Sequence, residues 1–118
     1  MKKLILIVAI LTFSLGFSQS EKISKAEVLS TFKTAYNASN FSAIYNLLSE
    51  DFKSKKDLKS ITNYLKRFKN AKGEITNISS NGIENDGYIK YPITVGKLEN
   101  KLVLKYNNKN KLEYISFN

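Results

Sequence analysis

The pattern of apolar residues changes at Gly73, and this change constrains the fold more than any other feature of the chain. Before Gly73, apolar side chains recur every three or four residues, which is the periodicity of helices with one buried face. After Gly73, β-branched and aromatic residues dominate and turn-forming residues interrupt them, which is typical of short strands. Because helices come first and strands follow, the sequence predicts an α+β domain.

Three helices are predicted before this change. Ser24 and Glu27 have the spacing of a capping box, so the first helix begins after Ser24. "NASN" ends it, and its last residue, Asn40, is expected to cap a second, shorter helix that "SEDFKSKK" ends. A third helix is expected from about Lys56 to Lys69. The predicted core-facing residues are Val28, Leu29, Phe32, Ala35, Tyr36, Phe41, Ile44, Leu47, Leu48, Leu58, Ile61, Leu65 and Phe68.

Four strands are predicted after Gly73, over residues 74–80, 88–95, 101–106 and 111–117. The turns between them are expected at residues 85–87, 98–100 and 107–110, where Asn, Asp and Gly gather. Strands joined by short turns pair antiparallel, so the sequence predicts a curved four-stranded antiparallel meander with the helices packed on it. Pro92 implies an edge position or a bulge within the second strand.

The first twenty residues predict a secretory signal peptide. Two lysines are followed by an apolar run to about Phe13, and the small residues Gly16 and Ser18 precede a cut ahead of Gln19. An uncleaved membrane anchor is the alternative, but a spanning helix needs roughly 20 apolar residues. We therefore expect a signal peptide over residues 1–18, then a single domain over residues 19–118. The protein would be exported to the periplasm or beyond, without a transmembrane segment after cleavage.

The composition excludes several chemistries. The chain has no Cys and no His, which removes thiolate nucleophiles, imidazole bases and the usual zinc ligand sets. We therefore expect no metal site and no cofactor; the alternative is a hard-cation site of carboxylates and carbonyls, although no EF-hand spacing appears. The net charge is +9, but Arg67 is the single arginine, whereas nucleic-acid recognition favours arginine. No nucleic-acid partner is expected; a weaker alternative is that the lysines attach the protein to anionic polymers of the cell envelope.

One segment also suggests a family. "AYNASNFSAIYNLLSEDFK", followed by an amphipathic helix and an antiparallel sheet, resembles the nuclear transport factor 2-like superfamily, which includes ketosteroid isomerase. The likeness is strongest to small exported bacterial domains of unknown function, and it covers residues 23–117. It implies a cone-shaped fold. Enzymes of the superfamily place a carboxylate, a His or a Tyr inside the cone, but no motif here allows a catalytic residue to be assigned by resemblance.

Glu113 is a weak candidate for a catalytic acid. If Ile115 and Phe117 face the inside of the cone, strict alternation along the strand places Glu113 on the same face. A buried carboxylate needs a partner or a raised pKa, and is then a functional candidate. The alternative is that Glu113 forms a salt bridge with Lys101 or Lys105 on the neighbouring strand.

Glu50 and Asp51 are adjacent carboxylates at a predicted helix end. Neighbouring side chains there point apart, so we expect solvated charges rather than an acid/base pair.

The tyrosines are candidates for ligand binding. Seven tyrosines and seven phenylalanines make the domain rich in aromatic residues. A pocket lined by tyrosines with few charges suits an apolar ligand, whereas the alternative is ordinary packing with hydroxyls that reach the surface. The predicted ligand-binding residues are Tyr36, Tyr64, Tyr91 and Tyr106.

These features favour a non-enzymatic, exported binding or accessory domain that uses its cone or its sheet face. The partner would be a small apolar ligand or an envelope protein, and the open sheet also permits a homodimer. The main alternative is an isomerase or hydratase with an inward carboxylate and a tyrosine.

Overall fold

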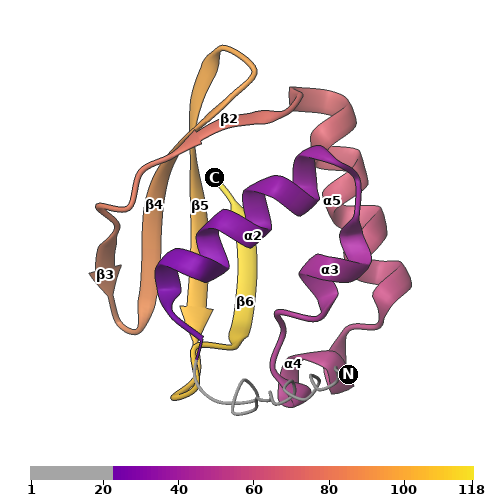
Figure 1. The fold of residues 1–118 in the computed structure, drawn as a ribbon, viewed down its shortest axis with the longest axis vertical. Helices are drawn as coiled ribbons and strands as arrows, with labels where there is room; N and C mark the ends of the chain where they lie inside the picture. Colours follow the sequence, from indigo (N-terminus) through magenta and orange to yellow (C-terminus); the bar gives the residue numbers. More distant parts are fainter. Residues whose placement is uncertain (1–22) are drawn as a thin grey trace, which may run out of the picture.

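The computed structural model describes residues 23–118, and the predicted signal peptide with its cleavage site lies outside this range. Within it, helices precede an antiparallel sheet that does not close on itself (Figure 1). The prediction of an α+β fold is confirmed.

The first predicted helix is confirmed as α2, Lys25–Asn37. The Ser24 hydroxyl oxygen accepts a hydrogen bond from the backbone N–H of Glu27 at 3.1 Å, as the predicted capping spacing requires. The five side chains predicted to face the core are the buried residues of this helix: Val28, Leu29, Phe32, Ala35 and Tyr36.

The second predicted helix is the short α3, Phe41–Tyr45. Asn40 lies at its N-cap position, but the Asn40 side chain makes no capping bond to the backbone. Its Oδ1 atom accepts instead from the Ser42 hydroxyl at 3.0 Å. Leu47 and Leu48, which follow the helix, are buried as predicted.

"SEDFKSKK" was predicted only to end the second helix, and this prediction is wrong. The segment forms another helix, α4, Glu50–Lys55. The Ser49 hydroxyl oxygen accepts from the backbone N–H of Phe52 at 3.1 Å and begins it. Acidic residues in the first turn and lysines in the last turn complement the helix dipole, which explains why so short a helix forms.

The third predicted helix is α5, Leu58–Lys72, and it continues beyond the predicted end near Lys69. Asp57 caps it by accepting from the backbone N–H of Ser60 at 2.9 Å, and hydrogen bonding to Ser60 lowers the pKa of the Asp57 carboxyl. The helix ends at Gly73, where φ is 101°. None of the helices described between residues 23 and 118 is long and apolar enough to cross a membrane.

The sheet has five strands rather than the predicted four. They are β2 Ile75–Ile78, β3 Ile83–Asn85, β4 Tyr88–Val95, β5 Leu98–Tyr106 and β6 Leu112–Phe117. All neighbouring strands pair antiparallel, in the order β2-β4-β5-β6, and the missed strand β3 also pairs with β4. The four predicted strands, β2, β4, β5 and β6, therefore lie in the predicted order, and β3 is the strand that the prediction missed.

Pro92 explains why β2 and β3 are separate strands. The β2 partner segment on β4 begins at Ile93, and the β3 partner segment ends at Lys90, so Pro92 lies opposite the gap between them. Proline has no N–H to donate there. Its carbonyl oxygen accepts from the backbone N–H of Ser79 at 2.9 Å, in the connection between the two strands.

The predicted turn at residues 85–87 is confirmed, with φ of 58° at Asp86 and 87° at Gly87. The turn predicted at residues 98–100 is wrong, because these residues belong to β5. The chain instead turns at Gly96, where φ is 62° and an added Cβ would lie 2.9 Å from a backbone carbonyl oxygen of α5. Glycine is the residue that this position accepts.

The hydrophobic core lies between the helices and one face of the sheet, called here the inner face. Helix α2 crosses in front of the sheet, and α5 runs alongside β6 (Figure 1). The strands alternate accordingly: on β4, Tyr91, Ile93 and Val95 are buried, whereas Tyr88, Lys90 and Pro92 are exposed. None of the described helices α2 to α5 covers the opposite face, called the outer face (Figure 1).

Candidate binding surface

Two of the four predicted ligand-binding tyrosines lie in an aromatic cluster beneath the helices. The cluster consists of Phe32, Tyr36, Tyr64, Phe68 and Phe117. Its tightest contact stacks Phe68 on Phe117, with 3.8 Å between ring centroids.

Both hydroxyls of this cluster are used inside the chain. Tyr36 has no exposed surface, its hydroxyl donates to the Gly73 carbonyl oxygen at 2.9 Å, and burial raises the pKa of Tyr36 to about 12. The Tyr64 hydroxyl accepts from the backbone N–H of Phe117 at 3.1 Å. These hydroxyls hold the end of α5 and the end of β6 in place, and they do not point into a common pocket.

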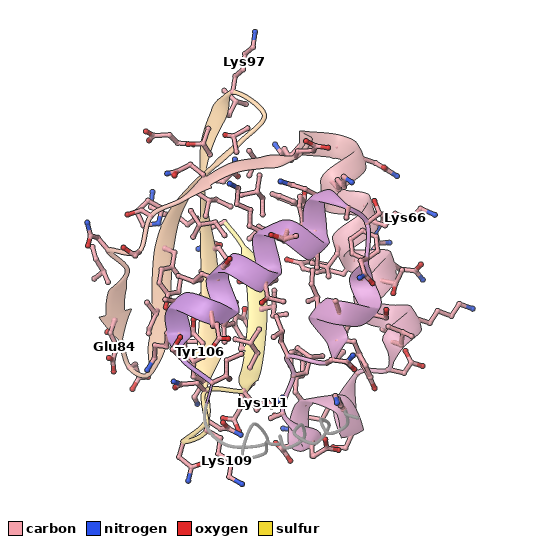
Figure 2. The ribbon with its side chains drawn as sticks, viewed as in Figure 1. Lys66, Glu84, Lys97, Tyr106, Lys109 and Lys111 are labelled. Atoms are coloured by element: carbon pink, nitrogen blue, oxygen red, sulfur yellow. The ribbon has the colours of Figure 1, made fainter. Side chains whose placement is uncertain are left out.

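The other two predicted tyrosines form a separate pair. The hydroxyl oxygens of Tyr91 and Tyr106 lie 3.0 Å apart in a hydrogen bond between neighbouring strands. Burial raises the pKa of both hydroxyls. Tyr106 lies near the start of α2 (Figure 2), where the Lys25 ammonium nitrogen is 5.1 Å from its ring centroid. The structure thus divides the four tyrosines into two pairs instead of bringing them around one ligand.

Glu113 lies at a bulge of β6. Lys105 pairs with Tyr114 and Tyr106 pairs with Leu112, so Glu113 is an extra residue in the ladder. The bulge interrupts the alternation from which the direction of the Glu113 side chain was predicted. Leu112 and Ile115, three residues apart, are both buried, which strict alternation does not allow. Glu113 is half-buried, and neither of the two ion pairs found within residues 23–118 includes it.

Glu50 and Asp51 are exposed on α4. Glu50 lies 3.6 Å from Lys53 Nζ, and Asp51 lies 3.3 Å from Lys55 Nζ. Both are helix-surface ion pairs in solvent, in line with the expected solvated role.

The outer face carries a groove of about 650 Å³, called here the outer groove. Lys105 on β5 pairs with Tyr88 on one side and with Tyr114 on the other. The two tyrosine rings meet edge to face, with 5.1 Å between their centroids. The Lys105 ammonium nitrogen lies 5.2 Å from the Tyr88 ring centroid. The residues that line the groove are Ile83, Asn85, Asp86, Tyr88, Lys90, Val103, Tyr114, Ser116 and Asn118.

A second groove of about 570 Å³ lies between β6 and the helices α4 and α5, and is called here the edge groove. Tyr114 and Ser116 line both grooves, so the two meet on β6. The residues that line the edge groove are Phe52, Lys56, Ser60, Ile61, Asn63, Tyr64, Arg67, Tyr114, Ile115 and Ser116.

Sequence reasoning missed both grooves. Alternation along the strands does place Tyr88 and Tyr114 on the outer face, opposite the buried Tyr91 and Ile115. That signal was present in the sequence, but it was used only for the inner face.

Between residues 23 and 118, no three Asp or Glu side chains gather into a potential metal site. The fold and the two grooves define a small α+β domain with an open antiparallel sheet and a continuous accessible surface around β6. The chain matches no family model, and no curated protein or solved structure is significantly similar to it. The resemblance to the nuclear transport factor 2-like superfamily therefore stays a prediction.

Proposed function

We propose that this chain is an exported, non-enzymatic accessory domain that binds a protein partner through the outer face of its sheet. One observation carries the proposal. Five large apolar side chains are exposed in the described residues, and three of them line the outer groove. These are Ile83, 72% exposed, Tyr88, 37% exposed, and Tyr114, 39% exposed.

Such a cluster is typical of an interaction surface. Exposed apolar groups cost free energy in water, so a group of them on one face indicates a surface that a partner covers. Tyrosine is enriched at protein interfaces because it offers a large apolar ring with a polar end. The outer groove is open along the sheet, which suits a protein surface better than an enclosed small molecule.

The inner face supports an enzyme less well. An isomerase-type site needs a carboxylate and hydroxyl donors that converge on one point. The hydroxyls of Tyr36 and Tyr64 bond to backbone groups, and the hydroxyls of Tyr91 and Tyr106 bond to each other. No hydrogen bond joins Glu113 to any of these four hydroxyls in the described part of the chain.

Site-specific photo-crosslinking in the producing cells tests the proposal. A benzophenone amino acid replaces Tyr88 in the outer groove, and in a matched control it replaces Lys66, which points away from the sheet on α5 (Figure 2). We expect one discrete crosslinked species from position 88, none from position 66, and loss of that species in the additional variant Ile83→Lys. Equal products from both positions, or none from position 88, would contradict the proposal.

The same experiment identifies a homodimer. A crosslinked product of twice the chain mass, together with dimers in sedimentation of the purified protein, would make a second copy the partner. The mass of the protein recovered from its own cells tests export, since we expect a chain that begins at Gln19.

A further inference from the structure

The edge groove lies along the edge of strand β6. Within residues 23–118, β6 is the last strand of the sheet and pairs only with β5 along its length, apart from a bridge at Leu112. Lys101 and Asn118 exchange backbone hydrogen bonds of 3.1 and 2.8 Å. In an antiparallel ladder such pairs alternate with pairs that point their N–H and C=O groups away from each other. Ile115 therefore directs both backbone groups away from β5, toward the edge groove.

Both ends of this edge are already covered. At Leu112, the N–H donates to the Leu47 carbonyl oxygen and the C=O accepts from the Ser49 N–H, each at 2.8 Å. At Phe117, the Tyr64 hydroxyl accepts the N–H at 3.1 Å. Ile115, midway between them, makes no such contact with the helices in residues 23–118. The part of the edge without backbone partners among the described residues is therefore short and is centred on Ile115.

The edge groove is apolar in its middle and basic at its two ends. Its middle is apolar, with Ile61 and Ile115 almost buried and Tyr64 half-buried. Lys56 lies before the start of α5, and Arg67 lies in its second half, so the groove is basic at both ends. Among its lining residues there is no carboxylate, and neither cation belongs to an ion pair within the described residues.

The dimensions fit a short extended segment. α5 and β6 run in the same direction (Figure 1), and the contact of Tyr64 with Phe117 brings them together. From Leu58 to Arg67 the helix rises about 13–14 Å, and Lys56 precedes its first residue by two positions. In an extended chain, residues four apart are separated by about 13 Å and point to the same side.

We propose that the edge groove binds a short acidic segment of the protein partner as an additional antiparallel strand beside β6. The central residue of that segment is apolar and exchanges two backbone hydrogen bonds with Ile115, while its side chain packs against Ile61. Acidic residues two positions before and after it pair with Lys56 and Arg67. The proposal rests on the proposed function, since it takes the partner to be a protein, and it names the mode of binding.

Fluorescence polarisation with a labelled synthetic peptide, acetyl-Glu-Thr-Val-Thr-Glu-amide, tests this directly. We expect saturable binding to the purified protein. The double variant Lys56→Glu and Arg67→Glu is expected to weaken binding at least about tenfold, because it reverses both charges. The matched variant Lys66→Glu changes the same type of residue on the far side of α5 (Figure 2) and should leave the affinity unchanged. Circular dichroism establishes that each variant is folded.

A second peptide separates strand addition from charge attraction. N-methylvaline in place of the central valine keeps the side chain and both charges but removes the N–H that the Ile115 carbonyl oxygen accepts. We expect at least about tenfold weaker binding. Equal affinity for the two peptides, an equal loss with Lys66→Glu, or no binding of the first peptide would each overturn the proposal.

The outcome is distinguishable from that of the proposed function. A photo-crosslink at position 88 together with failure of the pentapeptide overturns strand addition alone. Pentapeptide binding without that crosslink overturns the outer-face assignment alone. Ile83→Lys, in the outer groove, should leave pentapeptide affinity unchanged.

Discussion

The inner and outer faces of the sheet carry tyrosines in opposite situations. On the inner side, Tyr36 is fully buried and its hydroxyl is bonded to a backbone carbonyl oxygen. On the outer face, Tyr88 and Tyr114 are more than one-third exposed, their rings contact each other, and the Lys105 ammonium lies over the Tyr88 ring. The same residue type therefore stabilises the fold on one face and presents accessible aromatic surface on the other.

The difference teaches that the content of aromatic residues alone does not locate a binding site. The aromatic rings of the four tyrosines predict ligand binding, but the hydroxyls of these residues form hydrogen bonds within the chain. The exposure of each ring and the hydrogen bonds of each hydroxyl distinguish the two faces better. If the comparison is right, substitutions on the inner side change mainly stability, whereas those on the outer face change mainly binding.

The largest expected effect is the loss of an aromatic ring from the inner cluster. Phe32 has no exposed surface and contacts Tyr36 and Phe117. Phe32→Ala should lower the free energy of unfolding by about 3–5 kcal/mol, because it removes buried apolar area and leaves a cavity. Urea unfolding followed by circular dichroism measures this. Tyr88→Ala on the outer face should cost less than about 1 kcal/mol, and equal losses would break the comparison.

The next effect depends on pH and concerns Tyr36. Its pKa is about 12 in the folded protein, because burial favours the neutral hydroxyl, and near 10 when unfolded. Below pH 10, Tyr36 is neutral in both states, and its contribution to the free energy of unfolding is fully present. Between pH 10 and 12 the unfolded state loses the proton first, so stability falls by on the order of 2 kcal/mol. Urea unfolding from pH 9 to 12 should show a shallower fall for Tyr36→Phe, and parallel curves would contradict this assignment.

Much of the fold was predictable because its signals are local. The cap at Ser24 and the apolar stripe of α2 depend on residues within one helix, and both predictions are confirmed. Helix α4 was missed although its signals are local too: Ser49 with two following carboxylates was interpreted as an ending rather than a beginning. The strand β3 is different, because its pairing depends on β4 and on the gap opposite Pro92.

The candidate surface was less predictable because it depends on register and tertiary packing. A turn at residues 98–100 instead of Gly96 gives β4 and β5 the wrong register. In the correct register, Lys105 lies between Tyr88 and Tyr114. The edge groove needs α5 to lie beside β6, which no local pattern indicates. The bulge at Glu113 likewise breaks the strict alternation from which its direction was predicted.

A smaller effect on stability is expected at Tyr64, where the aromatic cluster beneath the helices contacts the edge strand β6. Tyr64→Phe keeps the ring stacked on Phe117 but removes the hydroxyl that accepts the Phe117 N–H. We expect a loss of about 1 kcal/mol in the free energy of unfolding. Faster hydrogen exchange at the Phe117 amide, measured by NMR, should accompany it. An unchanged exchange rate would show that this hydroxyl does not protect the edge.

The smallest expected effect lies within the outer face. A double-mutant cycle with Tyr88→Ala, Tyr114→Ala and the combined variant measures the coupling of the two rings. We expect about 0.5 kcal/mol, because the rings meet edge to face but remain in contact with water. Urea unfolding of the four proteins gives the value. A coupling of several kcal/mol would make this pair structural, like the inner tyrosines, and the distinction between the two faces would fail. A small coupling leaves both rings free to contact a partner at little cost to the fold.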